Sequence, residues 1–228
     1  MKYKERYKKR RVVTKSIIAI IFVLLSLITV YLLYLFNIIP HKAYTNADFN
    51  ITTYISNVDK DSDGIDDQTD MLDATRKYIA TKPQYKSKYY GETGYPDDEF
   101  GVCTDVVAFA MRDAGYDLME LVNKDVVENP DAYPTIERPD KMIDFRRVRN
   151  LKYFFKRNFI SLTTDPSDIV EWQGGDIVIF EGHIAVVSDK RNRNGVTFVI
   201  HNAYPGQPSY EEDILEMRDD IVGHYRLS

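Results

Sequence analysis

The residue with the most distinctive chemistry in this sequence is Cys103, the only cysteine among 228 residues. It begins a segment in which apolar residues recur at three- and four-residue spacing, which predicts one face of a helix that ends near Gly115. A thiol in the first turn of a helix meets unpaired N–H groups and the positive end of the helix dipole, and both lower a thiol pKa. We therefore expect either an activated nucleophile or, as is usual for a free cysteine, a small buried core residue.

Two histidines could lie beside each other in the C-terminal third. Short runs rich in β-branched residues at 175–180, 183–189 and 196–202 predict consecutive antiparallel strands. His183 begins the second run and His201 lies near the end of the third, so the two side chains can be neighbours on one side of the sheet. Packing is the usual role of a lone strand histidine, but this topology offers a pair.

The segment DKDSDGIDDQTD, residues 59–70, has the ligand spacing of an EF-hand-type calcium loop, with Gly64 at the sharp bend. Ca²⁺ requires several hard oxygen donors around one ion. Aspartate at the twelfth place departs from the usual glutamate, and an Asp-rich turn without metal is the alternative. We expect a structural calcium ion held by Asp59, Asp61, Asp63, the carbonyl of Ile65, Asp67 and Asp70.

The N-terminus predicts a membrane anchor. Residues 1–15 form a basic tail, and residues 16–39 contain no charged side chain over a length that can cross a hydrocarbon core of roughly 30 Å. A signal peptide usually has a shorter apolar region and a small-residue cleavage site, whereas this run ends in bulky residues. We expect a single-pass cell-membrane protein that contacts the lipid bilayer through residues 16–39, with its N-terminus cytoplasmic and residues from about 41 onward outside.

Composition and topology limit the remaining possibilities. A hydrophobic content of 44% suits one ordinary domain, and a net charge of −5 gives no reason to expect nucleic acid as a partner. Residues 40–58 are expected to form an extracellular tether, 59–70 the acidic loop and 71–228 the main domain. Outside the membrane a lone thiol has no internal disulfide partner, which favours a chemical use for Cys103.

Six segments occur in order along the chain: GVCTDVV, IDFRRVRNL, GGDIVIF, HIAVVSD, VIHN and GHYR. From about Asp59 to the C-terminus, the sequence resembles an uncharacterised bacterial family catalogued as domain of unknown function 1287, within the NlpC-type branch of the papain-like cysteine peptidases. The resemblance implies an α+β fold in which a cysteine-bearing helix packs on an antiparallel sheet as a papain-like (NlpC-type) core, here preceded by a single transmembrane helix.

The resemblance also implies roles for the polar residues. Cys103 matches the nucleophile, His183 the general base, and His201 the residue that orients the base. Asn202 is the rival orienter, since strand alternation lets only one of the two adjacent residues face His183; we favour His201. Asp105 could cap the cysteine helix or bind a substrate amine.

Taken with the anchor, these roles predict an extracytoplasmic cysteine hydrolase of the thiol peptidase or amidase type, with no cofactor for catalysis. The resemblance implies peptidoglycan as the substrate, cut at a stem-peptide bond or, as the second choice, at the bond between muramic acid and L-Ala. A thiol acyltransferase or transpeptidase with the same triad is one alternative. A non-catalytic, calcium-stabilised wall-binding module is another. His224 resembles a family signature residue outside the triad, and we expect a structural role for it.

Overall fold

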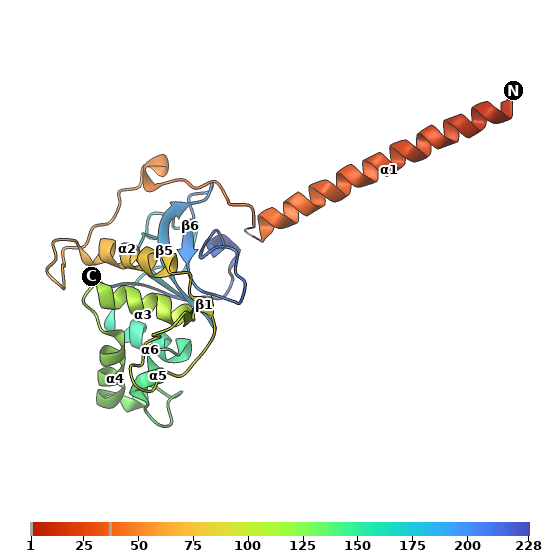
Figure 1. Cartoon of the computed structure of the whole chain (residues 1–228). Coiled ribbons are helices and arrows are strands. Elements are labelled where there is room, and N and C mark those ends of the chain that lie inside the picture. Colours follow the sequence, from red (N-terminus) through yellow and green to blue (C-terminus); the bar gives the residue numbers. More distant parts are fainter. Residues whose placement is uncertain (1, 37) are drawn as a thin grey trace. The chain divides into compact units, whose positions relative to one another are not determined.

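The computed structural model describes residues 2–36 and 38–228. The chain divides into two compact units, Met1–His41 and Lys42–Ser228. The first unit is dominated by one long helix, α1 (Lys2–Leu35) (Figure 1). It begins within the basic tail and ends before the expected residue 39.

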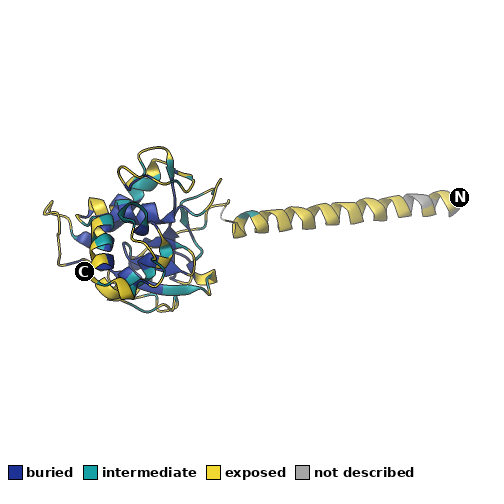
Figure 2. Cartoon of the chain, turned by 90° about the horizontal axis from the view of Figure 1, so that it is seen from below, coloured by how far each residue is buried: buried dark blue, intermediate teal, exposed yellow. Residues whose placement is uncertain are grey.

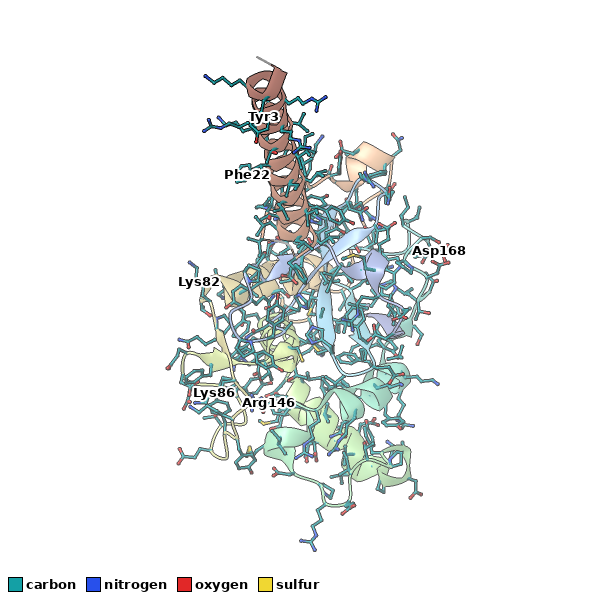
Figure 3. All side chains as sticks on the ribbon, turned by 90° about the vertical axis from the view of Figure 1, so that its right-hand side faces the viewer. Tyr3, Phe22, Lys82, Lys86, Arg146 and Asp168 are labelled. Atoms are coloured by element: carbon teal, nitrogen blue, oxygen red, sulfur yellow. The ribbon has the colours of Figure 1, made fainter. Side chains whose placement is uncertain are left out.

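Helix α1 is long and apolar enough to cross a membrane. Within Arg10–Leu35, an 18-residue stretch has a mean hydropathy of 2.8, and none of that stretch is buried (Figure 2). Phe22, for example, projects from the helix with 71% of its surface exposed (Figure 3). A helix that is apolar all round needs an apolar environment. A membrane span and a signal sequence both meet this description.

The second unit is a mixed α+β structure built on an antiparallel sheet. The predicted strands near 175–180, 183–189 and 196–202 are confirmed as the three consecutive strands β4, β5 and β6. In sheet order the six strands are β3 (Ile160–Ser161), β8 (Ile221–Arg226), β4 (Ile177–Phe180), β5 (Ile184–Arg191), β6 (Thr197–Ile200) and β7 (Glu211–Glu212).

Side-chain alternation along the strands buries both faces of this sheet. Ile177 and Ile179 of β4 join the larger core cluster, whereas Val178 and Phe180 join a smaller cluster around Trp172. Successive strand residues point to opposite faces, so a strand buried on both sides is a continuous apolar run. This accounts for the uninterrupted IVIF sequence of β4.

The larger cluster is formed with the helices. Helices α2 and α3 lie side by side (Figure 1), and α3 packs on β5 while α6 packs on β8. The predicted cysteine helix is confirmed as α3, and Gly115 follows its end with a positive φ of 80°. The helices are α2 (Asp67–Ala80), α3 (Cys103–Asp113), α4 (Leu118–Glu128), α5 (Lys141–Asp144) and α6 (Val148–Asn158).

Short elements complete the unit. A two-stranded parallel pair lies directly before α3, and it brings Tyr85 beside Gly101. These strands are β1 (Gln84–Tyr85) and β2 (Phe100–Gly101), and the 3₁₀ helices are η1 (Asn46–Phe49), η2 (Pro130–Ala132) and η3 (Leu215–Met217).

Residues 42–58, expected as a tether, are packed into the second unit. The Arg191 side chain is fully buried and donates to Asn46 Oδ1 at 2.5 Å, while its backbone pairs with Tyr44. Its remaining guanidinium donors meet the carbonyls of Ile169, Trp172 and Gly195. A buried guanidinium needs acceptors for its donors, and the segment around Asn46 supplies one of them. The compact domain therefore begins near residue 42.

Candidate active site

Cys103 lies at the first position of α3, with 7% of its surface exposed. The helix begins here because the Asp105 side chain turns back and accepts from the Val102 N–H at 2.8 Å. Burial raises the pKa of the thiol to about 11, although nearby N–H groups of Ile184, Thr104 and Cys103 itself act in the opposite direction. The expectation of a depressed thiol pKa is therefore wrong for this resting structure, because desolvation outweighs the helix terminus.

A buried ion pair holds the start of α3 in place. Arg146, between α5 and α6, contacts both oxygens of Asp105 at 2.6 and 2.8 Å, and it also donates to the carbonyl of Lys88 at 2.7 Å. Both side chains of the pair are almost completely buried. Because Asp105 already caps the helix and binds Arg146, the structure supports its capping role and leaves its oxygens engaged away from a substrate amine.

His183 and His201 are brought together as a hydrogen-bonded pair. His183 lies in the connection between β4 and β5, and its Nε2 is 2.8 Å from His201 Nδ1. Asn202 takes a different position, where it donates to the carbonyls of Pro83 and Gly101 at 2.9 and 3.1 Å. Both residues follow the end of β6, and their hydrogen bonds separate the two candidate orienters, with His201 beside His183.

A fourth residue, Glu212 of β7, extends this pair. Its Oε2 lies 3.0 Å from His201 Nε2, while its Oε1 is buried with no hydrogen-bond partner among the described residues. Sequence reasoning missed Glu212, because it lies in a two-residue strand whose pairing with β6 has no local signal. The one available clue was an acidic pair shortly after the third predicted strand.

These contacts assign the histidine tautomers. An ionised carboxylate only accepts hydrogen bonds, so His201 carries its proton on Nε2 and accepts at Nδ1. His183 must then donate from Nε2, which leaves its Nδ1 with a lone pair. The relay from Glu212 therefore sets His183 as a proton acceptor.

The electrostatic surroundings keep His183 neutral. Burial lowers the pKa of its imidazole to about 3, with smaller contributions from His201 and Arg218, while Asp220 acts in the opposite direction. No hydrogen bond joins His183 to the Cys103 thiol among the described residues, although Ile184, next in the chain, contacts that thiol through its N–H. Catalytic hydrogen bonds are often long in unliganded structures. In the resting structure the thiol and the imidazole are therefore both neutral.

The acidic loop brings part of the expected calcium set together. Carboxylate oxygens of Asp59, Asp61 and Asp63 all lie within 4.8 Å of one another. Burial, followed by the charges of these three residues and Asp67, raises the pKa of Asp70 to about 6, and one Asp70 oxygen is buried with no partner among the described residues.

The two other expected ligands differ in position. Asp67 accepts from the Lys60 N–H at 2.8 Å and from the Tyr116 hydroxyl, so both of its oxygens are already engaged. Ile65 follows the bend and its N–H donates to Asp63 at 2.8 Å. Gly64 adopts the positive φ expected at the bend, 96°. Both oxygens of Asp59 also accept N–H groups within the loop, and Asp61 and Asp63 accept one each. Asp61, Asp63 and Asp70 therefore keep an oxygen without a hydrogen bond among the described residues, while Asp67 ties the loop to the domain.

His224, on β8, belongs to a separate buried cluster. Its two ring nitrogens lie 3.0 Å from an Asp176 oxygen and 2.8 Å from the Thr163 carbonyl, and its ring stacks on Trp172 at 3.7 Å. Arg226 also pairs with Asp176. With every polar atom of the ring engaged, the geometry fits the expected structural role.

Comparisons with known proteins agree on one family. Residues 72–227 match the family described as Domain of unknown function (DUF1287). The chain is also similar to the uncharacterized protein YijF of Escherichia coli (strain K12), with 40% identity over 170 residues that cover 68% of this chain and 80% of that protein. No solved structure matches the chain. Cys103, His183, His201 and Glu212 all lie inside the matched region. Because the match covers more than half of the chain, this chain belongs to the family described as domain of unknown function DUF1287.

Proposed function

We propose that the second unit is a cysteine hydrolase with a papain-like arrangement, in which Cys103 is the nucleophile and His183 its base. The observation that carries the proposal is the hydrogen-bonded line from His183 through His201 to Glu212, which starts beside the helix that bears the thiol. A nucleophile, a base and groups that fix the tautomer of the base are the parts that acyl transfer requires.

The first half of the reaction is acylation of the thiol. As Cys103 Sγ attacks a substrate carbonyl carbon, its proton passes to His183 Nδ1, because thiol and imidazole are both neutral beforehand. The carbonyl oxygen becomes an oxyanion, which the N–H groups of the first turn of α3 can stabilise. Collapse of the tetrahedral intermediate releases the amine, which takes the proton from His183 and leaves a thioester on Cys103.

The second half uses water as the acyl acceptor. His183 takes a proton from a water molecule as the water oxygen attacks the thioester carbonyl. The tetrahedral intermediate collapses, the C–S bond breaks and the carboxylic acid leaves, and the Cys103 sulfur takes the proton back from His183. Positive charge on the imidazole is stabilised through His201 by the Glu212 carboxylate. The Asp105–Arg146 pair fixes the start of α3, and with it the position of the thiol.

The proposed substrate is an amide in peptidoglycan, with a stem-peptide bond as the first choice. This choice rests on the resemblance to NlpC-type peptidases and on the predicted extracytoplasmic position. A fold-level resemblance supports a reaction class better than a substrate. An acyltransferase would use the same thioester but pass the acyl group to an amine, so added amine would appear in the product.

A digest of purified peptidoglycan tests the proposal. The full-length chain in detergent should release new amino groups, and Cys103→Ala should release none. Val127→Ala, which alters an exposed side chain on α4, is the matched control and should retain full release. Mass spectrometry of the fragments identifies the bond cut. Equal release by the wild type and Cys103→Ala would refute the hydrolase.

We also propose that residues 59–70 bind one structural calcium ion. The specific support is the unpartnered Asp70 oxygen together with the convergence of Asp59, Asp61 and Asp63. Four carboxylates close together repel one another, and a divalent cation relieves that repulsion. The last residues of this segment, Asp67 to Asp70, form the first turn of α2, so the ion would stabilise the start of that helix.

For α1 we propose a retained anchor with a cytoplasmic N-terminus. The basic residues lie at the N-terminal side of the apolar segment, as the positive-inside bias requires. Protease treatment of intact cells, or of spheroplasts if the cells have an outer membrane, should digest the second unit and spare the N-terminal tail. A mature chain that lacks α1 would instead indicate a cleaved signal sequence.

A further inference from the structure

A cavity of about 330 Å³ lies where β1 meets the end of β6 and the loop that follows it. Small-molecule sites typically occupy roughly 300–1,000 Å³, so this cavity could accept one ring-sized group. Its walls include Gln84, Tyr85, Asn202, Tyr204, Gln207 and Tyr210.

Two residues that line the cavity lie near proposed catalytic residues. Tyr85 lies close enough to Cys103 that a thiolate there contributes, after burial, to the raised pKa of its phenol. Burial, and then the charge of Glu212, likewise raises the pKa of Tyr204. Asn202 forms the wall between them, since it follows His201 and binds the carbonyl of Gly101, two residues before the nucleophile. Cys103 does not itself line the cavity, but Tyr85 pairs with Gly101 and Asn202 binds it, so a group bound here would lie near the start of α3.

The walls are polar but uncharged. None of the described residues that line the cavity carries a formal charge. Burial is the largest cause of the raised pKa of each of the three lining phenols, Tyr85, Tyr204 and Tyr210, so each phenol stays neutral at physiological pH. A charged ligand would lose hydration here without a counter-charge. The Asn202 and Gln207 side chains already bond to the backbone. Among the described lining residues, the Gln84 amide and the hydroxyls of Tyr85 and Tyr204 are therefore the polar groups left to pair with a ligand.

Aromatic rings and amides together suit one kind of ligand. Tyr204 is 45% exposed at the rim and offers a ring face, while Gln84 is an exposed amide that can donate and accept. A neutral pyranose presents an apolar ring face and a rim of hydroxyl groups, and an N-acyl substituent adds a neutral amide. These are the complements of the walls.

We propose that this cavity binds a neutral N-acylated sugar of the substrate. Its role as a substrate subsite rests on the proposed hydrolase. The position near Cys103 then favours the amide attached to the sugar, which is the second choice predicted from the sequence, over a bond far along the stem peptide. Sugar binding itself requires no catalysis, so the two proposals can fail separately.

Saturation-transfer NMR on the full-length Cys103→Ala chain in detergent tests the binding. N-acetylglucosamine should receive saturation, whereas protonated glucosamine and glucuronate should receive little. Adding Tyr204→Ala should weaken binding about tenfold or more, the loss expected when one ring contact worth roughly 1.4 kcal/mol is removed. Tyr89→Ala is the matched control, since Tyr89 is 61% exposed and does not line the cavity.

A second variant keeps the test decisive if Tyr204→Ala does not fold. Gln84→Glu puts a negative charge at the rim and should shift preference from N-acetylglucosamine to glucosamine. Unchanged binding in both variants, or a preference of the parent chain for either charged sugar, would overturn the proposal. Wall hydrolysis by the wild type without sugar binding removes only this inference, and sugar binding without hydrolysis removes only the proposed reaction.

Discussion

The reactivity of Cys103 should depend on pH in a way that separates burial from activation. Alkylation with a small reagent such as iodoacetamide modifies the thiolate, and a single cysteine makes the reaction simple to follow. Because burial raises the thiol pKa to about 11, we expect the rate to keep increasing with pH beyond 9, with no plateau near neutrality.

The expected size of the effect follows from the two pKa values. At pH 7.5 a thiol of pKa 11 is about 0.03% thiolate, whereas a free cysteine of pKa about 8.5 is roughly 10% thiolate, a ratio near 300. Burial also restricts access of the reagent and lowers the rate at every pH. The test therefore relies on the midpoint of the rate–pH curve and not on the absolute rate. The same chain unfolded in guanidinium provides the reference and should titrate near 8.5.

The assay is intact-protein mass spectrometry at timed intervals from pH 6 to 10.5, over which the folded state is checked by circular dichroism. His183→Ala should change the profile little, because a neutral imidazole contributes no charge to the resting thiol. A plateau below pH 8 that disappears in His183→Ala would show a preformed thiolate–imidazolium pair. That result would refute our reasoning that desolvation dominates this site.

Four other outcomes follow from the structure. Glu212→Gln lets the amide donate to His201 and reverses the tautomer relay, so kcat for wall hydrolysis should fall by up to about 10⁴ with KM little changed. Arg146→Met leaves the buried Asp105 carboxylate uncompensated and should lower the free energy of unfolding by about 3–5 kcal/mol in guanidinium titrations; a loss below 1 kcal/mol would contradict a buried pair. The raised pKa of Asp70 favours its protonated form in the folded chain, so the stability from this group is present below pH 3.8 and lost as pH rises through about 6. Asp70→Asn should therefore raise the calcium-free Tm at pH 7 and reduce the Tm increase that calcium causes. Equal Tm values of the wild type with calcium and with chelator would show that the loop binds no calcium. The lowered pKa of His183 acts in the opposite direction, because the folded chain disfavours the protonated imidazole. The stability of the fold that depends on this group is present above pH 6.5 and is lost as pH falls toward 3, by up to about 1.4 kcal/mol per pH unit. His183→Gln should flatten this part of the plot of unfolding free energy against pH.

Periodicity made much of the fold predictable. The helix that begins at Cys103 and the strands β4 to β6 are continuous segments whose apolar spacing is read locally, and the structure has them where the sequence predicts. The acidic loop and its Gly64 bend are equally local, since their hydrogen bonds join residues two to five positions apart. Short elements with no period of their own, such as β7 and η3, were not predictable in this way.

The packing of residues 42–58 was also beyond local reading. Polar composition predicted a tether, but Asn46 satisfies a guanidinium that lies 145 positions later in the sequence. The Arg191 side chain is buried, so it recruits acceptors from whichever segment can reach it. A contact of this kind depends on the whole fold.

By itself the sequence determined the nature of the parts: an apolar helix for a membrane or a signal, a thiol at a helix start, two strand histidines and an acidic loop. The tertiary structure alone decided how they act together. Pairing of β6 with β7 brings Glu212 to His201, and hydrogen bonds to the carbonyls of Pro83 and Gly101 hold Asn202 in a different position. Burial against the sheet raises the thiol pKa where helix position alone predicts a decrease. Desolvation depends on everything packed around a group, and no spacing along the chain records it.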